Sequence, residues 1–216
     1  MVFTIRYAIP MNGPGCQRSV SNKLLDIEGV NSIDVDLPQQ EVVINGEVAP
    51  SLIVKNMQEI GRDAFVRGSG APNSAAVAIL ETNAGAVKGL ARLIEVAQNK
   101  VLFDVTVDSS YANTAASVYS FGDISNPPKS LGSLLFNILR IPSPKSTEST
   151  ASGWATIGNT PLADLIGRSV HTDSGLTGIV ARSAGLWEND KTVCTCSGKT
   201  VWEERKDFRE HTSGNL

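Results

Sequence analysis

Cys194 and Cys196 are the residues whose type and spacing best fit soft-metal or redox chemistry in this chain. With one residue between them, two thiolates can converge on a single Cu(I) ion, which prefers thiolate ligands and accepts low coordination numbers. A zinc site needs four ligands, and the surrounding sequence offers no obvious third and fourth. The same pair could exchange disulfides, one sulfur attacking and the other resolving. A lone C-x-C also fits two ordinary small buried residues, but its polar surroundings favour a chemical role.

A third cysteine, Cys16, follows the loop Met11–Gly15 and lies at or near the expected start of a helix. A helix N-terminus stabilises a thiolate. One thiolate is nevertheless a poor Cu(I) site, and Met11 is expected to fill core space beneath the loop rather than to bind metal. A structural role is therefore favoured for Cys16, which is kept only as a secondary metal-binding candidate.

Composition and charge exclude several classes of function. The 216 residues are 41% hydrophobic and 19% charged, with a net charge of -3, so no basic excess points to nucleic acid. No apolar run reaches the roughly 18 residues of a membrane span, and the N-terminus lacks the pattern of a signal peptide. Three cysteines do not suit a secreted disulfide scaffold. We expect a cytoplasmic protein without a membrane span.

The first segment, residues 1–67, is expected to form a ferredoxin-like βαββαβ fold. Alternating apolar residues predict strands at 3–9, 33–37, 41–45 and 64–67. Helical spacing predicts one helix that begins near Cys16 and ends at Gly29, and a second that opens at Pro50 and ends at Gly61.

The rest of the chain is expected to be a second domain and a tail. Residues 68–74 have linker composition and predict a domain boundary. Residues 75–190 show no convincing amphipathic helix, and their short strands predict an antiparallel sandwich or barrel. The expected strands are 75–81, 87–96, 100–107, 115–121 and 177–182. Residues 122–161, rich in proline, serine, glycine and threonine, are expected to form long loops over the sheet. The polar tail, 191–216, is too short to make its own core.

Several segments carry a resemblance to one family, and they are Tyr7–Met11, Arg67–Ser74, Val77–Thr82, Gly89–Arg92, Leu165–Ser169, Val180–Gly185, Trp187–Asn189, Val193–Cys196 and Gly198–Asp207. Through them the chain resembles the fungal copper chaperones for Cu,Zn superoxide dismutase over nearly its whole length. The resemblance implies a heavy-metal-associated front domain, an all-β Cu,Zn superoxide dismutase-like Greek-key barrel that docks on the dismutase, and a short flexible C-x-C tail.

The resemblance also implies roles for individual residues. Cys194 and Cys196 would deliver Cu(I) to apo Cu,Zn superoxide dismutase within a heterodimer and promote the intrasubunit disulfide of the dismutase. Arg168 and Arg182 match arginines on or near the docking side of the family's central domain, although they fit equally well as residues that hold loops. Trp202 is a third docking candidate, since exposed tryptophans in mobile segments often anchor partners.

Two departures from the family pattern limit what is expected. The family's front motif is Met-x-Cys-x-x-Cys, but Gly13 stands at the first cysteine position, so the front domain is expected to bind copper poorly or not at all. Ser117-Val118-Tyr119 replaces the His-x-His of true dismutases, and His171 alone cannot build a copper–zinc site. We therefore expect a metallochaperone without dismutase activity.

Other functions stay open at this point. The main alternative is a copper-independent folding and disulfide chaperone for the dismutase, which the missing front cysteine supports. A general thiol oxidoreductase is less favoured, because the chain lacks a C-x-x-C motif on a thioredoxin-like fold. A binding-only scaffold with inert cysteines is a further reading. The sequence leaves open a homodimer through the central domain and a second pool in the mitochondrial intermembrane space.

Overall fold

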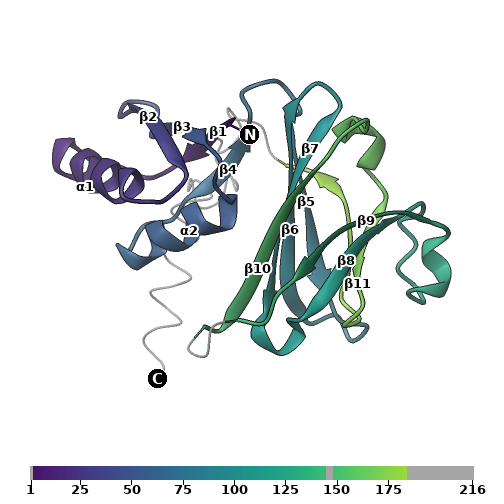
Figure 1. The fold of residues 1–216 in the computed structure, drawn as a ribbon. Helices are drawn as coiled ribbons and strands as arrows, with labels where there is room; N and C mark the ends of the chain where they lie inside the picture. The colour runs from purple at the N-terminus through teal and green to yellow at the C-terminus, as the bar shows by residue number, and fades with distance from the viewer. Residues whose placement is uncertain (1, 145–147, 184–216) are drawn as a thin grey trace, which may run out of the picture. The chain divides into compact units, whose positions relative to one another are not determined.

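The structure is a computed structural model that describes residues 2–144 and 148–183 of the chain. Residues 1–183 form one compact unit. Within the described residues the strands make two antiparallel sheets, one of four strands and one of nine (Figure 1). Among these residues, no helix combines the length and the apolar character that crossing a membrane requires.

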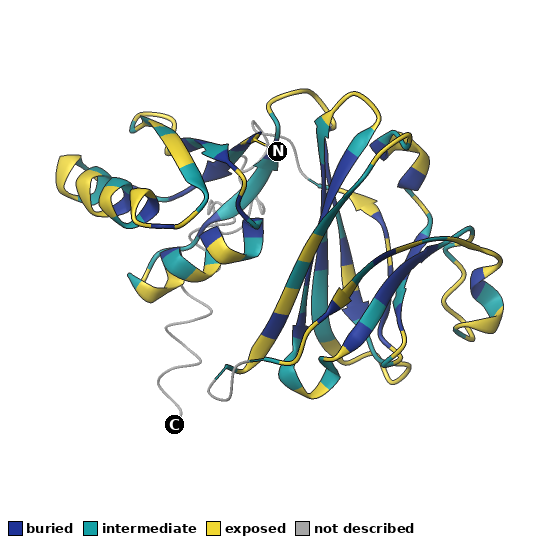
Figure 2. Cartoon of the chain, in the orientation of Figure 1, coloured by how far each residue is buried: buried dark blue, intermediate teal, exposed yellow. Residues whose placement is uncertain are grey.

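The N-terminal part has the predicted βαββαβ order. Its elements are β1 (Phe3–Ala8), α1 (Pro14–Leu25), β2 (Val30–Asp36), β3 (Glu41–Gly46), α2 (Pro50–Glu59) and β4 (Phe65–Gly68). The strands pair in the order β2-β3-β1-β4, and the helices lie against one face of the sheet, with exposed residues along their outward sides (Figure 2). The core between helices and sheet consists mainly of Phe3, Ile5, Tyr7, Val20, Leu24, Val42, Ile44, Ile53 and Met57. The ferredoxin-like prediction is confirmed.

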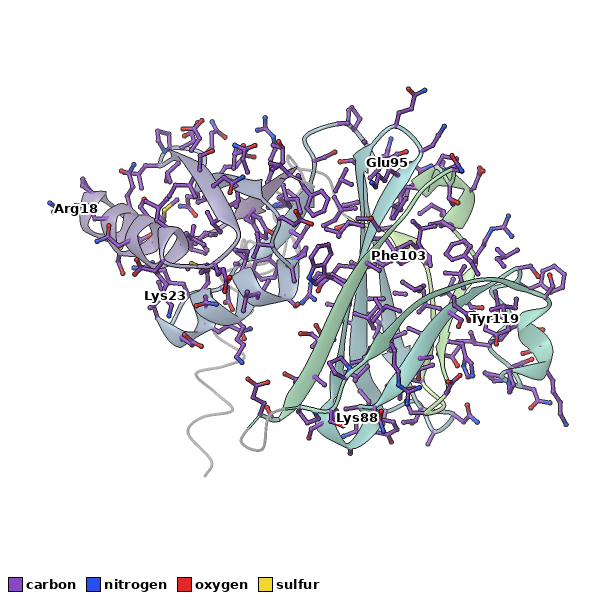
Figure 3. The ribbon with its side chains drawn as sticks, viewed as in Figure 1. Arg18, Lys23, Lys88, Glu95, Phe103 and Tyr119 are labelled. Atoms are coloured by element: carbon purple, nitrogen blue, oxygen red, sulfur yellow. The ribbon has the colours of Figure 1, made fainter. Side chains whose placement is uncertain are left out.

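The second sheet is barrel-like and built almost wholly from strands. Its elements are β5 (Ala75–Glu81), β6 (Val87–Ala97), β7 (Lys100–Asp108), η1 (Ser109–Tyr111), β8 (Thr114–Tyr119), η2 (Lys129–Leu131), β9 (Leu134–Ile141), β10 (Thr150–Ile157), η3 (Leu162–Leu165), β11 (Ser169–Thr172), β12 (Thr177–Ile179) and β13 (Ala181–Arg182). The order is β10-β7-β6-β5-β12-β11-β8-β9, with β13 beside β5. Phe103 points into the interior (Figure 3), where its ring meets Phe136 edge-on at 6.0 Å. The predicted all-β second part is confirmed.

The prediction of long loops over residues 122–161 is wrong, because β9 and β10 lie in that stretch. The β9 sequence LLFNILRI is apolar enough for a strand and buries Ile138 and Ile141. The β10 sequence TASGWATI is rich in small residues, yet it pairs with β7 along its whole length. The proline-, serine- and glycine-rich sequence around β9 and β10 is typical of loops, which is why neither strand was predicted.

Of residues 68–74, predicted as linker, Gly68 is the last residue of β4 and the rest pack closely after it. The Ser69 backbone N–H donates to the Ser74 hydroxyl at 3.0 Å, and the Glu95 N–H donates to the Ser74 carbonyl at 2.8 Å. Ser74 is only 3% exposed. The turn between the two sheets is therefore held by hydrogen bonds from both sides.

Candidate functional site

Cys16 lies in the first turn of α1, as the sequence predicts. Pro14 occupies the first helical position, where its missing N–H costs nothing, and the Gln17 N–H closes the first turn on the Gly13 carbonyl at 3.1 Å. Met11 is 2% exposed and belongs to the core, which agrees with its predicted role as a core residue. The Cys16 thiol is half-buried and not part of a disulfide.

The surroundings of Cys16 favour its thiolate form. The backbone N–H of Asn12 contributes most to lowering the pKa of the thiol, and the Arg62 side chain lowers it further by hydrogen bonding and charge. Arg62 also donates to the Pro10 carbonyl at 2.9 Å, so it ties the loop that carries Cys16 to the turn before β4. Sequence reasoning missed Arg62, since the two segments lie 46 positions apart and nothing in their spacing links them.

The front loop nevertheless presents one thiol only. Gly13 adopts an extended backbone with φ 160°, and a Cβ placed there would meet no heavy atom within 4 Å. Among the residues that the structure describes, no group of three or more His, Cys, Asp or Glu side chains could hold a metal ion. The loop thus presents one thiol whose surroundings favour the thiolate, with open space at Gly13.

The predicted tail residues Cys194, Cys196 and Trp202 lie outside the described residues. Arg168 is described and holds loops: its Nε donates to the Asp164 carbonyl and its Nη1 to the Ser120 carbonyl at 3.0 Å. Arg182 lies in β13 with an exposed side chain, opposite Ala76.

A group of exposed apolar side chains lies beside Arg168 on the outward face of the second sheet. We call it the outer patch and define it as Ile79, Phe121, Leu134 and Ile179, which are 51%, 60%, 49% and 40% exposed. Strand register links its members along one sheet: Ile179 pairs with Ser169 and Ser169 with Tyr119, and Leu134 pairs with Tyr119 just after a register shift between β8 and β9. Direct partners share a face of a sheet.

Hydrogen bonding and close packing complete the outer patch. The Ser169 hydroxyl donates to the Phe121 carbonyl at 2.7 Å, and the backbone at Gly122 passes close to the Ile179 side chain. Extending the Thr177–Glu81 pairing by two residues sets Ile179 beside Ile79. Sequence reasoning missed this patch, although the alternation in β5 makes Ile79 an outward apolar residue between buried Ala78 and Leu80.

Comparison with known proteins relates almost the whole chain to one group. The family model "Heavy-metal-associated domain" matches residues 6–63. The superoxide dismutase 1 copper chaperone of Candida glabrata is 40% identical over 93% of this chain and 92% of its own length. That of Saccharomyces cerevisiae is 39% identical over 93% of both chains. The chain belongs to the superoxide dismutase copper chaperone family. The mouse copper chaperone for superoxide dismutase is 27% identical over 94% of this chain and 89% of its own.

As a member of the superoxide dismutase copper chaperone family, the protein is a metallochaperone rather than an enzyme. His171 lies among neutral strand residues in the structure. His171 pairs with Ser117 and Thr177 across neighbouring strands, and its Nδ1 lies 2.8 Å from the Thr177 hydroxyl. The Tyr119 ring meets its imidazole edge-on at 5.9 Å. Burial lowers the pKa of His171, which favours the neutral ring. His171 is thus an ordinary hydrogen-bonded strand residue.

Proposed function

We propose that this chain delivers Cu(I) from Cys194 and Cys196 to apo Cu,Zn superoxide dismutase. The observation that carries the proposal is the match, over more than nine-tenths of both chains, to relatives named superoxide dismutase 1 copper chaperone. The front loop supports the tail as donor, because it offers the single thiol of Cys16. Two thiolates make a labile site for a soft cation, and a recipient with a better site can then remove the metal.

The outer patch is proposed as the surface that docks on the dismutase, giving a heterodimer. Apolar side chains gathered on an otherwise polar surface mark interaction sites, and Phe121 has the size of an anchoring residue. Arg168 would act as a positioning residue here, since it holds the Ser120 carbonyl next to Phe121. Arg182 and Trp202 are proposed as rim contacts.

The tail is also proposed to form the dismutase disulfide by exchange. A dismutase thiolate would attack a Cys194–Cys196 disulfide and form a mixed disulfide, and the second dismutase thiolate would displace the tail sulfur. The dismutase pair is then oxidised by two electrons and the tail pair reduced by two. An oxidant such as dioxygen must reoxidise the tail before another round.

Cu(I) titration against a competing chelator tests copper delivery. We compare the wild type, Cys16→Ser and the Cys194→Ser/Cys196→Ser double variant, all fully reduced. The double variant is expected to lose tight Cu(I), whereas Cys16→Ser keeps it. If no variant holds Cu(I) above background, copper delivery is wrong. The alternative, a copper-independent folding and disulfide chaperone, which the single front thiol favours, then takes its place.

Charge placed on the outer patch tests docking. Ile79→Asp and Phe121→Asp are each expected to weaken the complex with apo dismutase at least about tenfold in sedimentation velocity, because a buried unpaired carboxylate is costly at an interface. Leu25→Asp, at a 53% exposed leucine on α1, is the matched control and should leave the complex intact. Equal losses in all three variants would reject this surface. The same variants show whether two copies of this chain pair through the outer patch.

A further inference from the structure

β7 is buried on both of its faces, which is unusual for a strand of an antiparallel sheet with one face on its own core. Val101, Phe103 and Val105 point into the barrel interior, and all three are fully buried. Leu102 and Asp104 alternate with them and point outward, yet they too have no exposed surface. Some other part of the protein must cover this outward face.

Register shows how far the covered face extends. Across β6 and β7, Ile94 pairs with Leu102 and Arg92 with Asp104, and across β7 and β10, Asp104 pairs with Trp154. Direct partners share a face, so these five residues form one outward surface, which we call the covered face; Trp154, at its β10 edge, is 37% exposed. Ile94 is fully buried as well.

The N-terminal part of the chain supplies the apolar cover. Ile94 and Leu102 belong to the hydrophobic cluster formed by the helices and sheet of the front segment, not to the cluster inside the barrel. The ring of Phe3, on β1, meets the Trp154 ring edge-on with 5.8 Å between centroids. Such aromatic pairs add stability beyond the area they bury.

A polar contact fixes the position of the cover. The Ser51 hydroxyl, in the first turn of α2, donates to Asp104 Oδ1 at 2.6 Å, while Arg92 Nη1 donates to Asp104 Oδ2 at 3.1 Å. Asp104 is fully buried, so each carboxylate oxygen needs its donor. Buried ionic groups contribute little net stability but can enforce one arrangement. The apolar contacts thus stabilise the packing of the N-terminal part on the covered face. The hydrogen bond between Ser51 and Asp104 fixes the position of α2 on that face.

We propose that residues 1–68 serve as a permanent structural cover for the outward face of β6 and β7, so that the two sheets fold and unfold together whether or not Cys16 binds metal. The cover explains why a front domain persists beside a metal motif that has lost its first cysteine. It is independent of copper delivery by the tail.

Native-state hydrogen exchange on the full chain tests the proposal. Ser51→Ala removes the polar contact, and Leu102→Ala removes apolar contact outside the barrel interior. Each should speed amide exchange at least about tenfold, both in β1 and α2 and in β6 and β7, since a lost buried hydrogen bond or side chain costs at least enough to change the equilibrium by that factor. The controls are Ser19→Ala and Leu25→Ala, at exposed positions of α1, and should change exchange less than about twofold. Faster exchange confined to the segment that carries the substitution overturns the proposal.

Trp154 fluorescence gives a second readout that survives if Leu102→Ala does not fold. In a Trp187→Phe/Trp202→Phe background, Trp154 is the single tryptophan, and its emission reports on the contact between the N-terminal part and the second sheet. Its emission and the far-ultraviolet circular dichroism should change together in urea, as two-state unfolding requires, and Cys16→Ser should behave identically. An emission shift at lower urea than the loss of circular dichroism would mean that the cover leaves first, which overturns the proposal. Neither measurement involves copper or dismutase, so failure of copper delivery would not affect the result.

Discussion

At the scale of single residues, the front loop holds Cys16 in surroundings that favour its thiolate, beside open space at Gly13. The Asn12 N–H and the Arg62 guanidinium favour the Cys16 thiolate, and a Cβ at Gly13 would meet no heavy atom within 4 Å. The loop therefore has room for the start of a second side chain beside Cys16.

Restoring the missing sulfur should restore a front metal site. Gly13→Cys places a thiol where the extended backbone tolerates any residue, three positions before Cys16. We expect it to bind one additional Cu(I) per chain in the Cys194→Ser/Cys196→Ser background, as measured by chelator competition. Gly13→Ser is the matched control and should bind none. This prediction is wrong if Gly13→Cys behaves like Gly13→Ser.

The reactivity of Cys16 should depend on Arg62. Arg62→Gln removes the positive charge and should raise the pKa of the Cys16 thiol, leaving less thiolate at pH 7. In the Cys194→Ser/Cys196→Ser background, Arg62→Gln is therefore expected to slow the alkylation of Cys16 by iodoacetamide, as measured by mass spectrometry. Arg62→Lys keeps the charge and should retain most of the rate. Equal rates in Arg62→Gln and wild type would mean that the Asn12 N–H alone sets the pKa.

At the scale of elements, the pairing of β12 with β5 depends on the absence of a side chain at Gly178. A Cβ there would lie 2.1 Å from the Ile79 carbonyl oxygen, so Gly178→Ala must push the strands apart. We expect a loss of about 1–3 kcal/mol in the free energy of unfolding measured in urea, together with weaker docking, because Ile79 and Ile179 belong to the outer patch. Gly158→Ala, where nothing lies within 4 Å, should stay within about 0.5 kcal/mol of wild type. Similar losses in both would contradict the steric reason.

The elements also show what the sequence could and could not predict. Period-two alternation gave the front strands and Pro50 marked the start of α2, because these are local signals, whereas α1 begins at Pro14, two residues before the expected start. β10 escaped prediction, since Gly153 and its small neighbours resemble a loop until pairing with β7 is known. The role of Asp104 was equally hidden, because Ser51 lies 53 positions away and meets it only in the folded chain. Local chemistry at Cys16 was predictable, whereas every contact between segments required the fold.

At the scale of the whole molecule, two aspartates of β7 should give stability opposite dependences on pH. Burial raises the pKa of Asp104, against Arg92 and Ser51, which lower it. Its contribution to stability is therefore present below the unfolded pKa of about 3.9 and is lost as pH rises through the folded pKa. The hydroxyl of Ser110 lowers the pKa of Asp108, so that contribution is present above about 3.9 and is lost as pH falls.

Urea unfolding at a series of pH values measures both effects. Relative to wild type, the free energy of unfolding of Asp104→Asn should increase as pH rises above about 4. That of Asp108→Asn should instead decrease relative to wild type as pH rises through about 4. Asp108 is half-buried and lies 3.7 Å from Lys88; because hydrogen bonds from Ser110 are the main cause of its lowered pKa, high salt should screen only the smaller Lys88 contribution. Curves for the two variants that run parallel to wild type would show that neither carboxyl changes its pKa on folding.

The covered face also has a consequence for how the chain is made. Synthesis runs from the N-terminus, so the cover, complete at Gly68, leaves the ribosome about 40 residues before β7 ends at Asp108. At about 5–20 residues per second this is a lead of roughly 2–8 s, so residues 1–68 are already available when β7 is complete. Ile94, Leu102 and Trp154 therefore emerge after the segment that covers them, so the two sheets can close over this face as soon as the barrel strands are made.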